Sequence, residues 1–285
     1  MNKEYIEFKK ERDLGAIISD AFKFMRLEGK EFFSTIVKVA AIPILITIIG
    51  AIFIGYSLST ISSESTPEMM GLSIGGAGFL TIIAYIVTLV FINLAGMYYI
   101  KSYIDNNGNV NEEEVKDNSK NKFWSFTGFG ILAMLIVMFS MLFCVLPMFY
   151  TAIVLSLGAS ILVFENESAT ATVSKCFNLI SGHFWETFGV IFVVGLLVGM
   201  LGYVFKIPAI IYQFVQMGIG MNNEDPTQIF NLFKDPVYII LNLVSIVGQL
   251  MFYTITLVTN VFLYFDINEQ KNLTGTLEKI DGLGQ

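Results

Sequence analysis

Histidine, cysteine and charge are all scarce in this chain of 285 residues. His183 is the one histidine, so a site built from several imidazoles is excluded. The two cysteines, Cys144 and Cys176, are too few and too far apart for a disulfide framework or a zinc-ligand spacing. A net charge of −7 without a basic stripe offers no footprint for nucleic-acid phosphates. We therefore expect no metal, no cofactor, no catalytic residue set and no nucleic-acid partner.

Charged residues make up only 14% of the chain, whereas apolar residues make up 54%. An average soluble domain is about a quarter charged, so the composition favours a membrane protein. The first thirty residues are too highly charged to be the apolar core of a signal peptide. The first apolar run is therefore predicted to be a retained membrane span.

Six apolar runs reach or approach the roughly 20 residues that a helix needs to cross a bilayer core of about 30 Å. None of them carries a charge near its middle, and the fifth could continue towards Met217. The predicted spans are residues 34–56, 76–103, 126–145, 147–164, 187–205 and 237–264. The fold class is therefore an all-α integral membrane protein with six transmembrane helices in one polytopic domain, residues 1–285.

The distribution of basic residues predicts the orientation of these spans. Cytoplasmic loops are enriched in Lys and Arg. If the N-terminus is cytoplasmic, every one of the 17 Lys and Arg residues except Lys206 and Lys234 falls on the cytoplasmic side. We expect residues 1–31 and the tail 265–285 to be cytoplasmic. The cytoplasmic segment between spans two and three is polar and rich in Asn, which predicts a solvated loop with a helical turn near NEEEV.

A short amphipathic stretch, residues 168–182, interrupts the spans. Its apolar residues recur with the helical period, but it is too short and too polar to cross a membrane. It is predicted to be an interfacial helix on the cytoplasmic leaflet, which ends at Gly182 and is followed by Trp185 as an aromatic anchor. Its apolar face comprises Val173, Cys176, Phe177, Ile180 and Phe184.

Residues 13–27 have the same design, with Asp13 as the N-terminal cap of the helix. Aligning Gly29 with Gly182 also aligns Phe32 with Trp185, so each amphipathic helix precedes an outward-running span. This predicts a parallel internal repeat, although two amphipathic helices could also arise independently. The predicted apolar face holds Leu14, Ile17, Ile18, Ala21, Phe22 and Met25.

The stretch ILVFENESATATVSKCFNLISGHFWETFGVIF carries a resemblance to a known family. The chain resembles the YciC-like six-span inner-membrane proteins of bacteria, which are related to the membrane domain of some glycerophosphoryl diester phosphodiesterases. The resemblance implies the six-span fold and the bacterial inner membrane, but no particular activity. The separate catalytic barrel of those phosphodiesterases has no counterpart in this chain. The matching positions are Glu165, Ser174, Lys175, Leu179, Gly182 and Trp185.

Charged and aromatic residues near the cytoplasmic ends of the spans are candidates for binding a lipid or a partner. Lys38, inside span one, either marks a site or extends its ammonium group to the membrane surface. Glu165 either pairs with Lys175 or Lys38, or caps the helix that begins near Ser168. His183, beside Trp185, lacks a ligand set and is more simply an interfacial residue.

Polar and small residues within the spans have two interpretations each. Asn93, Asn242, Gln249 and Asn260 either form hydrogen bonds between helices or line a polar cavity. Gly195, Gly199 and Gly202 allow close helix packing, within the chain or in a homo-oligomer.

These features favour a non-enzymatic membrane module that binds lipids or a protein partner on the cytoplasmic face. The alternative is a transporter for a small or amphipathic solute, without proton coupling because no carboxylate lies in mid-span. An intramembrane enzyme is the weakest hypothesis, since no nucleophile–base pair or metal-ligand spacing is visible.

Overall fold

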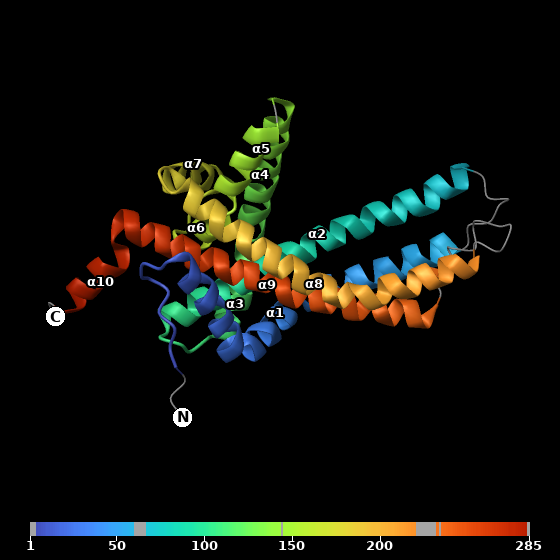
Figure 1. Cartoon of the computed structure of the whole chain (residues 1–285), viewed down its shortest axis with the longest axis horizontal. Helices are drawn as coiled ribbons and strands as arrows, with labels where there is room; N and C mark the ends of the chain where they lie inside the picture. Colours follow the sequence, from blue (N-terminus) through green and yellow to red (C-terminus); the bar gives the residue numbers. More distant parts are fainter. Residues whose placement is uncertain (1–3, 60–66, 144, 221–231, 234, 284–285) are drawn as a thin grey trace. The chain divides into compact units, whose positions relative to one another are not determined.

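The computed structural model describes residues 4–59, 67–143, 145–220, 232–233 and 235–283, and these contain helices and loops but no strand (Figure 1). Cys144 and Lys234 lie outside the described residues. The helices are α1 (Leu14–Ser59), α2 (Pro67–Asp105), α3 (Glu112–Asn121), α4 (Phe123–Phe143), α5 (Val145–Leu155), α6 (Gly158–Phe164), α7 (Ala169–Ile180), α8 (Phe184–Gly220), α9 (Pro236–Asn272) and α10 (Thr274–Leu283).

Six segments are long and apolar enough to cross a membrane, as the sequence predicts. Six segments of this length and hydrophobicity indicate a multi-pass membrane protein. Four helices are much longer than the predicted spans, with 46 residues in α1, 39 in α2 and 37 each in α8 and α9. The six segments are Leu14–Ser57, Gly78–Asp105, Phe123–Phe143, Val145–Phe164, Phe184–Gly218 and Pro236–Asn272.

The helices form two compact units. Unit 1 comprises Met1–Val39, Val90–Leu197 and Thr254–Gln285, and unit 2 comprises Ala40–Leu89 and Val198–Tyr253. Parts of α1, α2, α8 and α9 belong to each unit, whereas α3 to α7 and α10 lie in unit 1.

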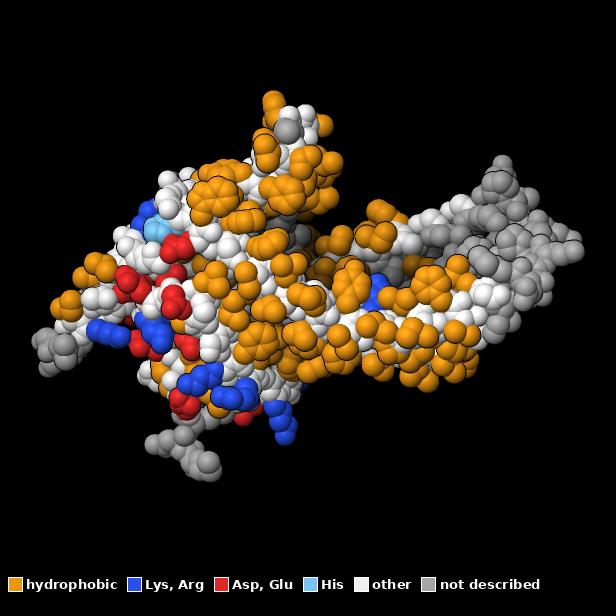
Figure 2. All heavy atoms as spheres, viewed as in Figure 1, with side chains coloured by type: hydrophobic (Ala, Val, Ile, Leu, Met, Phe, Trp, Pro, Cys, Tyr) orange, Lys and Arg blue, Asp and Glu red, His pale blue; other side chains and the backbone are white. Residues whose placement is uncertain are grey.

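Unit 2 has small and polar residues inside and large apolar residues outside. Large side chains such as Ile42 (73% exposed), Leu80 (67%) and Phe214 (68%) face outward, and Figure 2 shows hydrophobic atoms covering much of the visible surface. Small residues at helix contacts are typical of membrane proteins, where lipid covers the outer surface. Its described buried residues are Ala40, Gly55, Ser57, Thr88, Gly202, Ala209, Leu232, Ser245 and Gly248.

Unit 1 instead has an aromatic core. The Phe8 ring stacks on that of Phe262 at a centroid distance of 4.2 Å, and Phe24 lies edge-on to Tyr103 at 5.5 Å. These four side chains are at most 1% exposed. Burial of aromatic rings stabilises this part of the protein as it does the core of a soluble domain. The α4–α5 segment of the same unit nevertheless exposes many apolar side chains, including Leu142 and Leu146.

The amphipathic helix predicted at 13–27 differs from the structure at its end and on its buried face. Gly29 is buried inside α1, so this stretch and span one form one continuous helix. Leu14 and Phe22 are exposed, while Phe24 and Glu28 are buried. The sequence did not reveal this rotation, because two of the aromatic rings that contact Phe24, those of Phe8 and Tyr103, lie outside α1.

The second amphipathic helix is α7, and its predicted ends agree with the structure. The Ser168 hydroxyl accepts a hydrogen bond from the Ala171 amide at 3.4 Å, and Gly182 has φ +91°. Cys176 and Ile180 are buried and Asn178 is exposed, as the helical period predicts. However, α7 packs on α4, α5 and α6, so protein as well as any lipid covers its apolar face.

The structure differs from the sequence analysis in three further segments. The fourth span is interrupted at Ser156–Leu157, between α5 and α6, and the Phe129 ring fills the space beside Gly158. The segment near NEEEV forms the ten-residue helix α3 rather than one turn. The tail predicted at 265–285 begins inside α9, where Phe265 and Glu269 are buried, and continues as α10.

The internal repeat stays a prediction, and its aligned positions have different surroundings. Phe32 is fully buried, whereas Trp185 is 78% exposed. Gly29 lies within a helix, whereas Gly182 lies in a turn. A shared sequence pattern here accompanies two different local structures.

Candidate functional site

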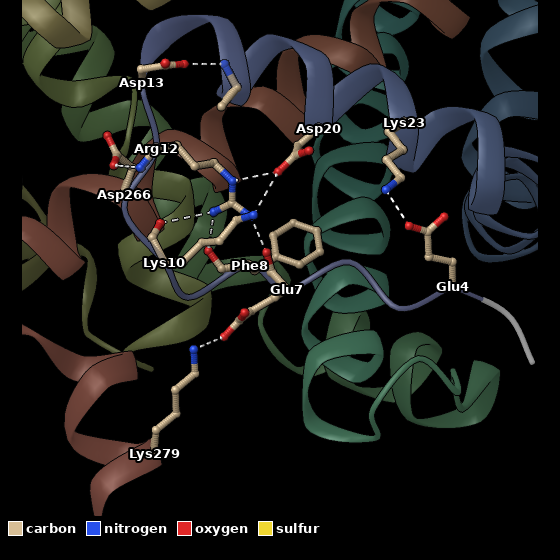
Figure 3. Close-up of polar contacts among 11 residues, drawn as sticks. Glu4, Glu7, Phe8, Lys10, Arg12, Asp13, Asp20, Lys23, Asp266 and Lys279 are labelled. Carbon is tan, nitrogen blue, oxygen red and sulfur yellow. Dashed lines mark hydrogen bonds and ion pairs between the residues drawn. The ribbon is translucent and has the colours of Figure 1, made fainter.

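Arg12 is the centre of a polar network in unit 1 that joins the N-terminal segment to α1 and α9 (Figure 3). Its backbone amide donates to Asp266 Oδ1 at 2.7 Å, and its Nε donates to Asp20 Oδ2 at 2.9 Å. Another guanidinium nitrogen donates to the Phe8 carbonyl at 2.7 Å. Burial lowers the pKa of Arg12, and the hydrogen bond to Asp20 opposes this effect. These bonds fix the path of the N-terminal segment, residues 4–13.

The N-terminal segment also binds α10. Lys9 Nζ lies 2.7 Å from Glu278, and Lys279 Nζ lies 2.6 Å from Glu7. The carboxylate of Glu269 accepts bonds from the Gly275 amide at 2.6 Å and from the amide of the following residue, which satisfies free N–H groups in the first turn of α10. Exposed ion pairs contribute about 0.2–1 kcal/mol each, so the Glu269 contacts supply the more specific anchor for α10.

Glu165 and Lys175 form an ion pair, one of the alternatives that the sequence left open. Lys175 also lies 2.8 Å from Glu167, and the Tyr264 hydroxyl donates to Glu165 Oε1 at 3.0 Å. The bonds to the two carboxylates raise the pKa of Lys175. This cluster joins α7, α9 and the α6–α7 connection. Both candidate residues therefore have structural partners.

The other ionisable candidates also have structural partners. Lys38 Nζ pairs with Glu112 of α3 at 2.7 Å, a partner that the sequence did not indicate. His183 Nδ1 lies 3.1 Å from Glu186 Oε2. Trp185 is exposed, as expected for an aromatic anchor at a membrane surface.

The polar candidates within the spans are divided between the two units. Asn93 and Asn260 are half-buried residues of unit 1. In unit 2, Asn242 Nδ2 donates to the Tyr238 carbonyl at 2.8 Å, and Gln249 Nε2 donates to Ser245 Oγ at 2.9 Å. These two amides thus bond within α9.

The glycines of α8 have different surroundings. A Cβ atom on Gly202 would lie 3.6 Å from the Gln249 side chain, which is an ordinary packing contact. A Cβ on Gly195 or Gly199 would meet nothing within 4 Å. Packing within the chain therefore accounts for Gly202, and a homo-oligomer through the other two stays a prediction.

Sequence reasoning missed Glu28, a buried carboxylate in unit 1. It is 1% exposed, and the Tyr99 hydroxyl donates to its Oε2 at 3.1 Å. The sequence contains a signal for the burial of Glu28, because Phe24, Glu28 and Phe32 are spaced four residues apart and therefore share one face of the helix. Asp266 and Glu269, 2% and 3% exposed, were missed because they follow the apolar part of span six.

Within the part of the chain that the structure describes, no three His, Cys, Asp or Glu side chains are grouped to hold a metal. No protein-family model, curated protein or solved structure matches this chain.

Proposed function

We propose that the protein is a non-enzymatic, multi-pass membrane module that binds lipid. The inverted burial of unit 2 is the observation that carries this proposal. Large apolar side chains cover its outer surface, while glycine, serine and alanine occupy its helix contacts. Such a surface is stable when lipid surrounds it. Lipid is therefore a ligand for which this unit supplies extensive contact area.

The polar network of unit 1 supports a structural rather than a catalytic role for its charged residues. Arg12 bonds to a carboxylate and to backbone carbonyls, and Lys175 pairs with two carboxylates. Glu269 satisfies the first turn of α10. A catalytic acid or base needs access to a reacting group, whereas these side chains are directed at neighbouring segments of the chain.

The proposal includes a location and an orientation. We place the protein in the inner membrane of a bacterium, with both termini cytoplasmic, because all the basic residues except Lys206 and Lys234 then lie inside. The resemblance to the YciC-like family supports the same location. The stretch 13–27 and helix α7 lie at the cytoplasmic surface in this orientation, where unit 1 offers polar side chains to a protein partner.

A transporter is the alternative, and the bonding of its proposed polar residues weighs against it. Asn242 and Gln249 bond within their own helix instead of facing each other across a shared space. Thr47 and Thr88 of unit 2 likewise bond to each other at 2.9 Å. Polar residues that satisfy one another at helix contacts contribute to packing. An intramembrane enzyme has less support, because the ionisable residues described above have structural partners.

Native mass spectrometry of the gently purified full-length protein tests the proposed function. We expect wild-type protein to retain a small, reproducible number of lipid molecules after the detergent is removed. Reconstituted vesicles provide the comparison, since a transporter would also release an enclosed solute. Retained lipid without solute flux supports the proposal, whereas bare protein or solute-specific flux contradicts it. A protein that co-purifies in stoichiometric amount would identify the partner at unit 1.

A further inference from the structure

Lys206 is an isolated cation on the apolar surface of unit 2. It is exposed on α8, and the neighbouring Tyr203 (64% exposed) and Ile207 (48%) are exposed as well. The sequence predicts span five at residues 187–205 with a possible continuation towards Met217, and α8 does continue, to Gly220, with apolar side chains such as Ile211 outside. Lys206 therefore has apolar surface on both sides along its helix. Among the residues of unit 2 that the structure describes, Lys206 is the one basic residue.

The carboxylate that unit 2 could offer to Lys206 is already engaged. Among the side chains of unit 2 that the structure describes, Asp235 is the one acid. Its Oδ2 accepts a hydrogen bond from the Tyr212 hydroxyl at 2.5 Å, and its Oδ1 accepts one from the Val237 amide at 2.8 Å. Lys206 forms no ion pair with this residue. A lysine on a lipid-facing helix must direct its ammonium group to water or to an anion at the membrane surface.

Two further polar groups lie on the same strip of surface as Lys206. Tyr203 precedes it by three residues and Gly202 by four, so all three share one face of α8. The exposed Gln249 of α9 packs beside Gly202, where a Cβ atom would lie 3.6 Å from its Cγ. A cation, a phenol and an amide are thus placed within about a helical turn of one another. These groups match the negative charge and the acceptor oxygens of a phosphate.

The adjoining surface fits the remainder of a phospholipid. Gly199 lies one turn before Tyr203, and a Cβ atom there would meet nothing within 4 Å. The glycine leaves the helix backbone open beside an exposed aromatic ring. An acyl chain can lie along this surface while its phosphate contacts the polar strip.

We propose that Lys206, with Tyr203 and Gln249, binds the phosphate of an anionic glycerophospholipid. This inference rests on the proposed lipid-binding function and identifies the lipid class and its contact residues. The lysine neutralises the headgroup charge. The Tyr203 hydroxyl and the one N–H of the Gln249 amide that is not bonded to Ser245 supply hydrogen-bond donors. Lipids with a net negative charge are favoured over zwitterionic ones, whose own cation competes with the lysine.

The test compares phosphatidylglycerol with phosphatidylcholine on the full-length protein in detergent. Native mass spectrometry gives the bound fraction, and thermal unfolding gives the Tm shift caused by each lipid. Lys206→Gln removes the charge and Lys206→Arg keeps it. Lys116→Gln is the matched control, because Lys116 is exposed on the polar helix α3 and the substitution changes the net charge equally. Inorganic phosphate without lipid tests a free anion as the ligand.

We expect wild type, Lys206→Arg and Lys116→Gln to retain phosphatidylglycerol and to be stabilised by it. In Lys206→Gln the fraction of protein that retains phosphatidylglycerol should fall about tenfold, and the Tm shift caused by this lipid should fall to that caused by phosphatidylcholine. Unchanged phosphatidylglycerol binding by Lys206→Gln overturns the site but leaves the proposed function standing. A wild type that retains neither lipid contradicts both proposals. Equal effects on both lipids refute the charge preference, and stabilisation by inorganic phosphate alone refutes a lipid ligand.

Discussion

Replacing Gly248 by alanine should separate α8 and α9 within unit 2. A Cβ atom at this position would lie 2.4 Å from Phe205 Cγ, 2.6 Å from Cδ1 and 2.8 Å from Cβ. Ordinary carbon contacts are about 3.5–4.0 Å. The Cβ of Phe205 is fixed to its backbone, so a change of rotamer cannot remove this overlap. The two helices must therefore move apart, or their backbones must bend.

The expected loss of stability is the difference between two opposing effects. Insertion of a methyl group into a tightly packed contact costs about 1–3 kcal/mol, and the contact with a backbone-fixed atom favours the upper half of that range. Alanine gains about 1 kcal/mol over glycine inside a helix. The net effect of Gly248→Ala should therefore be a loss of about 1–2 kcal/mol in the free energy of unfolding.

Gly199→Ala is the matched control for this substitution. The residue lies in a helix of the same unit, and the new Cβ would meet nothing within 4 Å. Only the gain in helix propensity remains, so stability should stay the same or rise by up to about 1 kcal/mol. Unfolding in mixed micelles, followed by circular dichroism against the fraction of denaturing detergent, measures both variants. A Gly248→Ala protein as stable as Gly199→Ala would refute the close contact.

A double-mutant cycle identifies the clashing side chain. Phe205→Ala removes the atoms at 2.4 and 2.6 Å but retains Cβ. Gly248→Ala should therefore cost less in the Phe205→Ala background than in wild type, with a coupling of about 1 kcal/mol. Additive effects would mean that the clash involves another part of the structure.

Three further variants test local features of unit 1. Asp13→Ala should lower the free energy of unfolding by about 1 kcal/mol and accelerate hydrogen exchange in the first turn of α1, because the Asp13 carboxylate accepts a bond from the Ala16 amide at 2.6 Å. Asp13→Asn should remain near wild type, and equal exchange in both variants would contradict the cap. Lys271→Met should accelerate exchange at the end of α7, since its Nζ binds the Asn178 and Ser181 carbonyls; an effect confined to α9 would exclude this contact. Burial raises the pKa of Cys176 from 9.0 to about 12. In a Cys144→Ser protein, where Cys176 is the remaining thiol, maleimide should therefore react at pH 8 about a thousandfold more slowly than with an exposed cysteine, and the rate should increase as the pH rises. Rapid labelling at pH 8 would refute the packing of α7.

Contacts between residues close in sequence were the ones that sequence reasoning could predict. Glu165 and Lys175 are 10 residues apart, and their ion pair was one of the stated alternatives. The cap at Asp13 follows from the preferences of helix ends, whereas the structure places Ser168 rather than Glu165 at the start of α7. Lys38 and Glu112 are 74 residues apart, and nothing local to either residue indicates the other. Long-range pairs depend on how the helices pack, which periodicity does not specify.

The amino-acid sequence by itself determined the fold class and the number of apolar segments. Hydrophobic length is a local property, because each span must satisfy its backbone hydrogen bonds within its own helix. The tertiary structure decided which residues of each helix are buried and which stay exposed. It buried Phe24 and Glu28, covered α7 with α4 to α6, and left Lys206 on an apolar surface. These outcomes depend on which helices meet, since the same amphipathic pattern can face lipid or protein.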